Sequence, residues 1–440
     1  MRSGAVYREL AESAWCWVLD QVRGEDGPWL PEVVRDDEPP SGPGWDRDSL
    51  YSGIAGLAPV LAEVSRSRPL NELERAVGTG IVGRLSAVAA GRVEPSLYDG
   101  LAGDVTALRL LAPGAERIPL QRLAEMRTET GWPSTLGMQP GSTAPMTDLV
   151  TGTAGVVLAA VWAGGEQARE IAVTGGEALL GVAERTPAGL DWRMHPGYRS
   201  SSPNYSHGTA GVTAALAVAG TELGREDFVT AARQGAQHLV DVAALDDDGF
   251  VIPHTIPPST REVEPVTYGW CHGPTGTSLA FAALAYAGVD AVAGHDVEEL
   301  RQRCLNSVLA SGIPRRLRPG FWDNDGRCCG TAGVGDVLLD AAQDCPDATR
   351  AEVLLRAGIT MGDALVDRAI RDDAGARWRF IEHRQDTPLL PPGTSWMQGA
   401  AGIAAFLFRL ARVLDDSLGA SVVDRPDQWW AVPARLRTAN

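Results

Sequence analysis

Basic side chains are scarce in this chain of 440 residues. Lys and Arg together number 39 against 56 Asp and Glu, which gives a formal net charge of −17. No basic stripe is present that would bind nucleic acid or an anionic membrane surface, and we exclude functions of that kind. The acidic balance is compatible with a basic peptide as ligand.

Long apolar runs are also missing. No stretch approaches the roughly 18 consecutive apolar residues that a membrane span needs. Residues 1–27 carry charges through their apolar part, so they predict an amphipathic helix and not a signal peptide. We therefore expect no membrane span and a cytoplasmic location.

Cysteines are few, and three of the six are clustered. Without a signal peptide a disulfide framework is not expected. Cys16, Cys304 and Cys345 lie singly in or beside apolar, helix-like stretches, which predicts buried, inert thiols. Cys271, Cys328 and Cys329 are the exceptions, because they stand directly before glycine-containing turns.

Glycine, by contrast, is abundant and ordered. A Gly-x-x-Gly unit occurs seven times, and successive units are separated by 47 to 69 residues, a period that suits two helices and a loop per repeat. The first glycines are Gly53, Gly100, Gly152, Gly208, Gly273, Gly330 and Gly399. A missing Cβ lets backbones approach closely and permits positive φ, which predicts crowded turns at these positions.

The segments around these units predict two kinds of helix. About ten residues after each unit are apolar on nearly every side, as in helices buried all round. Amphipathic stretches precede them as outer helices, each expected to pack on the inner helix that follows: 7–22, 72–88, 116–127, 168–184, 226–243, 297–312 and 348–367.

We therefore predict an all-α protein, a single α/α toroid over residues 1–440 with seven inner and seven outer helices. The inner helices should begin near 53, 100, 152, 208, 273, 330 and 399. Closure into a ring is favoured over an open solenoid because the first and last units are as apolar as the middle ones, whereas solenoids need polar caps.

A closed ring would bring the seven turns to one end. The residues directly before the first glycines would then lie near one mouth: Ser52, Asp99, Thr151, His207, His272, Cys329 and Gln398. Cys271 and Cys328 occupy equivalent positions in consecutive repeats. Three thiolates from two neighbouring turns could bind Zn²⁺ tetrahedrally and leave one position open, as catalytic zinc sites do. With His272 as a fourth ligand the site would instead be structural, and buried free thiols are the remaining alternative.

The motifs "GWCHGPTG", "RCCGTAG" and "NYSHGTAG", set within seven Gly-x-x-Gly repeats, resemble the lanthionine synthetase C family over about residues 50–414. These are cyclases of lanthipeptide biosynthesis. The resemblance implies an α/α toroid with one zinc ion at its mouth. It further implies a reaction that adds a precursor-peptide cysteine to dehydroalanine or dehydrobutyrine, giving lanthionine or methyllanthionine.

The resemblance also implies roles for single residues. Cys271 and Cys328 match zinc ligands of the family, and Cys329 stands where the third ligand is usually histidine, which adds one negative charge. His207 matches a histidine that could protonate the enolate, with Asp148 to orient it. A core histidine and an N-cap carboxylate are the alternatives for these two.

One position departs from the family pattern. Some members have an arginine where this chain has Thr267. The enolate would then be stabilised by Tyr268, Arg327 or the zinc ion, among which the sequence does not decide.

The expected partners are a dehydrated precursor peptide with its leader, a separate dehydratase, and a transporter or larger biosynthetic complex. Two long loops, 249–270 and 371–396, are expected to form walls of a peptide-binding face, with plain surface loops as the alternative; residues 35–53 are similarly polar and lead into the first inner helix. Three other functions stay open: addition of glutathione to dehydrated residues, a leader-binding scaffold, and another toroidal enzyme such as a glycosidase or prenyltransferase.

Overall fold

Seven inner helices begin at the repeated glycines of the computed structural model, which describes residues 2–35, 38–39, 41–44, 46–134, 145–259, 264–316, 324–382 and 386–437. They are α2 (Leu57–Ser67), α4 (Leu101–Leu111), α6 (Thr153–Ala163), α8 (Thr209–Leu223), α10 (Pro274–Tyr286), α12 (Thr331–Asp344) and α14 (Ala400–Asp416). A 3₁₀ turn, Ile54–Gly56, precedes α2. Most of their residues are buried, as the apolar stretches predict.

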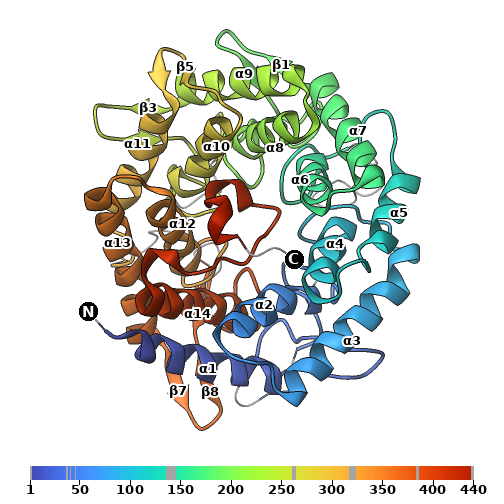
Figure 1. Ribbon diagram of the computed structural model, residues 1–440, viewed down its shortest axis with the longest axis vertical. Helices are drawn as coiled ribbons and strands as arrows, with labels where there is room; N and C mark the ends of the chain where they lie inside the picture. The colour runs from blue at the N-terminus through green and yellow to red at the C-terminus, as the bar shows by residue number, and fades with distance from the viewer. Residues whose placement is uncertain are drawn as a thin grey trace.

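Seven amphipathic helices form the outer layer. They are α1 (Gly4–Asp20), α3 (Glu72–Val88), α5 (Arg117–Met126), α7 (Glu166–Val182), α9 (Glu226–Val242), α11 (Val297–Ala310) and α13 (Ala348–Arg368). Figure 1 shows the two layers as concentric rings, with α1 and α2 beside α14. The all-α toroid and its closure are confirmed.

The pairing of the layers differs from the prediction. The outer helices α5, α7, α9, α11 and α13 pack mainly on the inner helix that precedes each of them, and α1 packs on α14, whereas α3 packs more on α4 than on α2, as predicted. Short connections explain this pairing: only Gly164–Gly165 separate α6 from α7, and only Gly224–Arg225 separate α8 from α9. Such short loops join antiparallel neighbours, while the long connections run from each outer helix to the next inner one.

A closed ring of backbone hydrogen bonds joins the seven turns. In each turn, the residue two positions before the first glycine donates its N–H to the carbonyl of the equivalent residue in the next turn, with N···O distances of 2.8–3.3 Å. The members, in order, are Tyr51, Tyr98, Val150, Ser206, Cys271, Cys328 and Met397, whose N–H returns to Tyr51. All seven Gly-x-x-Gly turns therefore lie at one end of the toroid, and we call this set the backbone ring.

Close backbone approach explains the glycines. A Cβ on Gly208 would lie 1.6 Å from the carbonyl oxygen of Ser202, and one on Gly330 would lie 2.0 Å from that of Asn324. Of the seven first glycines only Gly273 has a positive φ, +115°. The predicted positive φ is therefore wrong for the other six, where crowding alone requires glycine.

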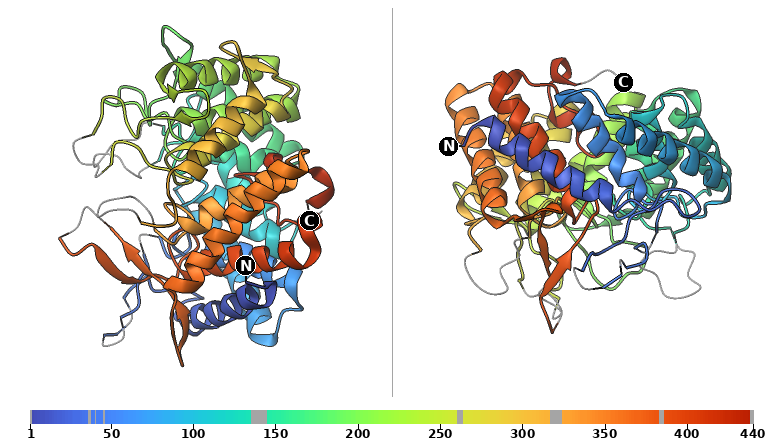
Figure 2. Two further views of the ribbon diagram at one scale, coloured as in Figure 1. Left: turned by 90° about the vertical axis from the view of Figure 1, so that its left-hand side faces the viewer. Right: turned by 90° about the horizontal axis from the view of Figure 1, so that it is seen from below.

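Five two-stranded antiparallel sheets occur in the connections among the described residues. They pair β1 (Glu184–Arg185) with β2 (Leu190–Asp191), β3 (Ala244–Leu245) with β4 (Phe250–Val251), β5 (Ala291–Val292) with β6 (His295–Asp296), β7 (Ile370–Asp372) with β8 (Gly375–Arg377), and β9 (Arg379–Ile381) with β10 (Leu389–Pro392). The segment with β7 to β10 projects from one end of the ring, and the C-terminal segment lies at the opposite end (Figure 2).

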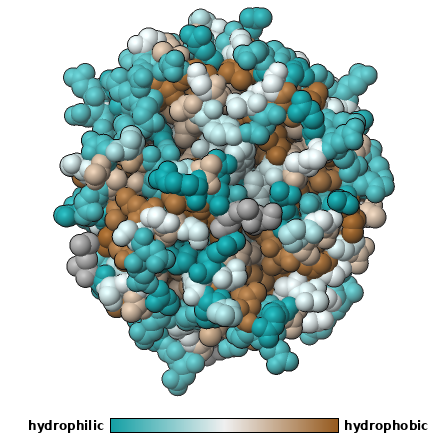
Figure 3. Space-filling model, in the orientation of Figure 1, coloured by the Kyte–Doolittle hydropathy of each residue, from teal (hydrophilic) through white to brown (hydrophobic). Residues whose placement is uncertain are grey.

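The outer surface follows the amphipathic pattern. The rim of the face in Figure 3 is mostly hydrophilic. Cys304 is buried as predicted, but Cys16 is exposed and Cys345 half-buried, so that prediction is wrong for Cys16, which lies on the outer face of α1. Within the described residues, no helix combines the length and apolar character needed to cross a membrane.

Candidate metal centre and active site

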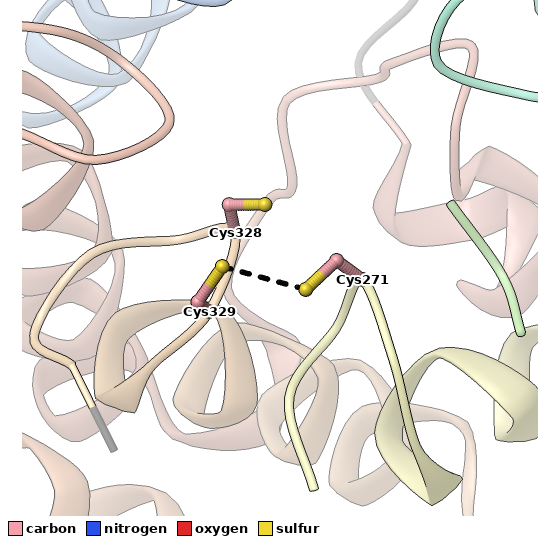
Figure 4. Close-up of side chains that lie close together, drawn as sticks. All are labelled: Cys271, Cys328 and Cys329. Atoms are coloured by element: carbon pink, nitrogen blue, oxygen red, sulfur yellow. Dashed lines mark hydrogen bonds between the residues drawn. The ribbon is translucent and has the colours of Figure 1, made fainter. Parts of the chain in front are cut away.

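Three cysteines from two neighbouring turns meet at the mouth. The Sγ atoms of Cys271, Cys328 and Cys329 all lie within 4.8 Å of one another, and those of Cys271 and Cys329 are 3.5 Å apart (Figure 4). All three side chains are buried. The backbone ring fixes the two turns, because the N–H of Cys271 donates to the carbonyl of Cys328 at 3.1 Å.

The electrostatics of the cluster suit a metal. Hydrogen bonds from Cys271 and Cys329, and a further one from Tyr51, lower the pKa of Cys328 despite its burial. The same thiol interactions, together with burial, raise the pKa of Cys271. Cys328 is therefore the group that favours the thiolate form, and it accepts hydrogen bonds from the two neighbouring thiols. A divalent cation could take the place of those thiol protons. Three thiolates with no carboxylate are a donor set that favours zinc among common divalent ions.

A cavity of about 360 Å³ opens over the cysteines. Its walls include the three cysteines and three histidines, His207, His254 and His272. Both loops expected to form walls contribute to it, residues 249–270 through His254 and residues 371–396 through Phe380 and Glu382. Residues 260–263 and 383–385 of these loops lie outside the described residues.

The predicted pair His207 and Asp148 comes together on one side of this cavity. His207 Nδ1 lies 3.2 Å from Asp148 Oδ2, and Asp148 also accepts hydrogen bonds from the N–H and hydroxyl of Thr151. Burial lowers the pKa of His207, but Asp148, and more weakly Asp99 and Cys329, outweigh burial and raise it. Asp148 therefore favours the protonated form of the His207 imidazole, which lines the same cavity as the cysteines.

The other polar candidates take different places. His272 lies outside the sulfur cluster. Its ring lies 3.9 Å from that of His254 and 6.0 Å from that of His207, between centroids. Thr267 lines the cavity, and its hydroxyl donates to the carbonyl of His272. Tyr268 and Arg327 are not among the residues that line this cavity.

Two lining residues escaped the sequence prediction. Tyr51 borders the cysteines, and its hydroxyl accepts a 2.9 Å hydrogen bond from Gln398. Burial and the neighbouring cysteines raise the pKa of Tyr51 well above its usual value. The signal for Tyr51 was its register, two residues before a first glycine, like Cys271 and Cys328. His254 lies in a long loop, and no repeat places it.

Fold and cluster together define a class: an α/α toroid with a buried three-cysteine cluster at its mouth. The family model described as "Lanthionine synthetase C-like protein" matches residues 44–414. The chain therefore belongs to the lanthionine synthetase C-like family.

The fold is shared with a solved structure. A structure of nisin cyclase matches with a TM-score of 0.57 at 16% sequence identity, over 85% of this chain and 94% of that one. The unsaturated glucuronyl hydrolase from Streptococcus agalactiae matches with a TM-score of 0.46 at 10% identity, over 94% of each chain. No curated protein matches the sequence.

Proposed function

We propose that this protein is a zinc-dependent lanthipeptide cyclase. It would close thioether rings by adding cysteine thiols of a dehydrated precursor peptide to dehydroalanine or dehydrobutyrine. The observation that carries the proposal is the shared cavity, which both the three-cysteine cluster and His207 line, with the buried Asp148 hydrogen-bonded to His207. Family membership supports the same reaction.

Each residue has a role in this proposal. Cys271, Cys328 and Cys329 would hold one zinc ion per chain, which as a Lewis acid would keep the peptide thiol ionised at neutral pH. The thiolate sulfur adds to the β-carbon of the dehydro residue, and the electron pair of the double bond moves to the α-carbon side as an enolate. His207, held by Asp148, donates its proton to the α-carbon. The proton that the peptide thiol lost restores the imidazolium, so the addition is balanced.

The proposed reaction requires other proteins. The reaction consumes an already dehydrated residue, so a separate dehydratase must act first, and the leader of the precursor peptide would bring both enzymes to one substrate. A transporter or biosynthetic complex fits this scheme as a further partner, and a cytoplasmic location stays a prediction.

Zinc content tests the metal site. We expect about one zinc per chain in the purified protein, its loss in Cys328→Ser, and its retention in Cys304→Ser. Cys304 is the matched control because it is also buried but lies in α11, outside the cluster. Wild-type protein without zinc would contradict the proposal and favour a leader-binding scaffold.

A peptide assay tests the reaction. Cyclisation leaves the mass of a dehydrated peptide unchanged but removes a free thiol, so we expect loss of alkylation by N-ethylmaleimide in mass spectra of the peptide. Glutathione supplied to the same reaction distinguishes the other enzymatic function, because its addition would increase the peptide mass. A mass increase without loss of peptide thiols would overturn ring formation as the main activity.

A further inference from the structure

A buried charged residue, Arg327, directly precedes the proposed metal ligand Cys328 in the sequence. The residues three positions before each first glycine are all buried, and they are Leu50, Leu97, Leu149, Tyr205, Trp270, Arg327 and Trp396. Their equivalence is structural, since the carbonyl of each lies within 2.7 Å of where a Cβ on the second glycine of its turn would stand. Six are apolar or aromatic. The seventh, Arg327, precedes the ligand Cys328.

Arg327 is held by a carboxylate that three arginines share. Its Nη2 donates to Asp336 Oδ2 at 2.7 Å, and its guanidinium lies 4.2 Å from the ring centroid of Trp396. Arg425 donates to the same oxygen at 2.9 Å, and Arg409 donates to Oδ1 at 2.7 Å. All three guanidinium groups are buried, so the position of Arg327 depends on how its neighbours orient Asp336.

Arg425 belongs to a segment that fills the far end of the toroid, residues 424–431, which lies in the middle of the ring in Figure 1. The segment is anchored to the residues of the turns. Asp427 accepts from the Tyr98 hydroxyl at 3.1 Å through its side chain and from the Tyr205 hydroxyl at 2.6 Å through its carbonyl. Trp430 Nε1 donates to the carbonyl of Leu279 at 3.0 Å. This segment lies beyond the family match, which ends at residue 414.

We propose that Arg425 is a positioning residue of the metal centre. Through Asp336 it fixes Arg327, and Arg327 in turn fixes the turn that carries Cys328 and Cys329. The C-terminal segment would thus serve the metal site from the opposite end of the toroid. Residues that hold metal ligands in place typically contribute 10- to 100-fold to metal affinity, and the chain Arg425–Asp336–Arg327 would do so through the backbone that joins Arg327 to Cys328.

The inference rests on the proposed zinc site, and its test measures the metal directly. Zinc affinity of the full-length protein is measured by competition with a chromophoric chelator, and the geometry of the site by the absorption spectrum after cobalt(II) substitution. We expect Arg425→Met to weaken zinc binding about 10- to 100-fold and to alter the cobalt spectrum. Arg425→Lys should restore part of the affinity because it keeps the charge.

Arg301→Met is the matched control. Arg301 is also buried and ion-paired, with Asp344 Oδ2 at 2.6 Å, but it lies on α11 away from the ligand turn. Its loss should lower thermal stability and leave zinc affinity and the cobalt spectrum unchanged. If Arg425→Met does not fold, Asp427→Asn takes its place, since Asp427 lies 3.5 Å from Arg425 Nε and its amide can still accept from Tyr98.

The outcomes separate the two proposals. Wild-type protein that binds neither zinc nor cobalt(II) overturns the metal site itself. Wild-type protein that binds zinc, with folded Arg425→Met equal to it in affinity and cobalt spectrum, overturns only the positioning role. Equal weakening by Arg301→Met would also overturn it, because general destabilisation would then account for the effect.

Discussion

Gly208→Ala should damage both the toroid and its active site. The added Cβ would lie 1.6 Å from the carbonyl oxygen of Ser202, which is 1.4 Å short of the 3.0 Å below which real Cβ contacts are essentially never found. The obstacle is backbone and cannot rotate away. Overpacking of this kind costs typically about 1–3 kcal/mol, and we expect at least that loss in the free energy of unfolding.

The displaced backbone would also move His207, the proposed proton donor. His207 directly precedes Gly208, and its bond to Asp148 is already 3.2 Å long. A shift of an ångström would break it, and a misplacement of that size costs about 100-fold in rate. We therefore expect a loss of thioether formation of about that size in protein that remains folded.

Gly83→Ala is the control for this substitution. Gly83 lies inside α3, and nothing stands within 4 Å of the position that its Cβ would take. Alanine there should raise the free energy of unfolding by about 0.5–1 kcal/mol, because glycine in a helix interior is unfavourable by that amount. Chemical denaturation measures both variants. Gly208→Ala as stable and active as the wild type would refute the explanation of the glycine repeat given above.

Two further substitutions test the site. Asp148→Asn should lower the pKa of His207, because burial then acts without the carboxylate. Since His207 is the proposed proton donor, the rate of cyclisation should then fall at a lower pH than in the wild type. The raised pKa of His207 also adds stability that is present below about pH 6.5 and is lost as pH rises through the folded-state value, so Asp148→Asn should reduce stability mainly at low pH. Asp191→Asn, beside His238 at 3.7 Å, is the control and should leave the rate profile unchanged. Cys329→His should keep the zinc ion but remove one negative charge from the site. Cyclisation should then slow about three- to tenfold, because the nucleophilicity of a thiolate falls with its basicity, with a Brønsted slope of about 0.4–0.5. A faster variant with full zinc content would contradict this.

Repetition made most of this architecture predictable. The seven Gly-x-x-Gly units gave the number and order of inner helices, and charge periodicity gave the outer ones. Register then placed Cys271, Cys328 and Cys329 in one cluster without any structural information. Tyr51 has the same register, but a tyrosine in that position does not by itself indicate a metal site.

Features outside the repeat pattern could not be predicted from the sequence. An amphipathic pattern shows which face of an outer helix is buried but not which inner helix covers it, so the predicted packing holds for α3 and is wrong for the other outer helices. His254 lies in a connection with no counterpart in other repeats. Cys16 sits among apolar residues of α1, but its own position on the helix faces outward, and a single residue at the edge of an apolar stripe is hard to place.

Closure by α1 and α14 has a consequence for synthesis of the chain. α1 is synthesised before the other described helices, yet the helix on which it packs, α14, begins nearly four hundred residues later. The outer helices α5, α7, α9, α11 and α13 pack mainly on an inner helix that precedes them in the chain. Contacts of such long sequence separation form late, and the apolar surface waiting for them is prone to aggregation. We therefore expect the apolar face of α1 to stay exposed until α14 has been synthesised, unless a chaperone or another partner binds it.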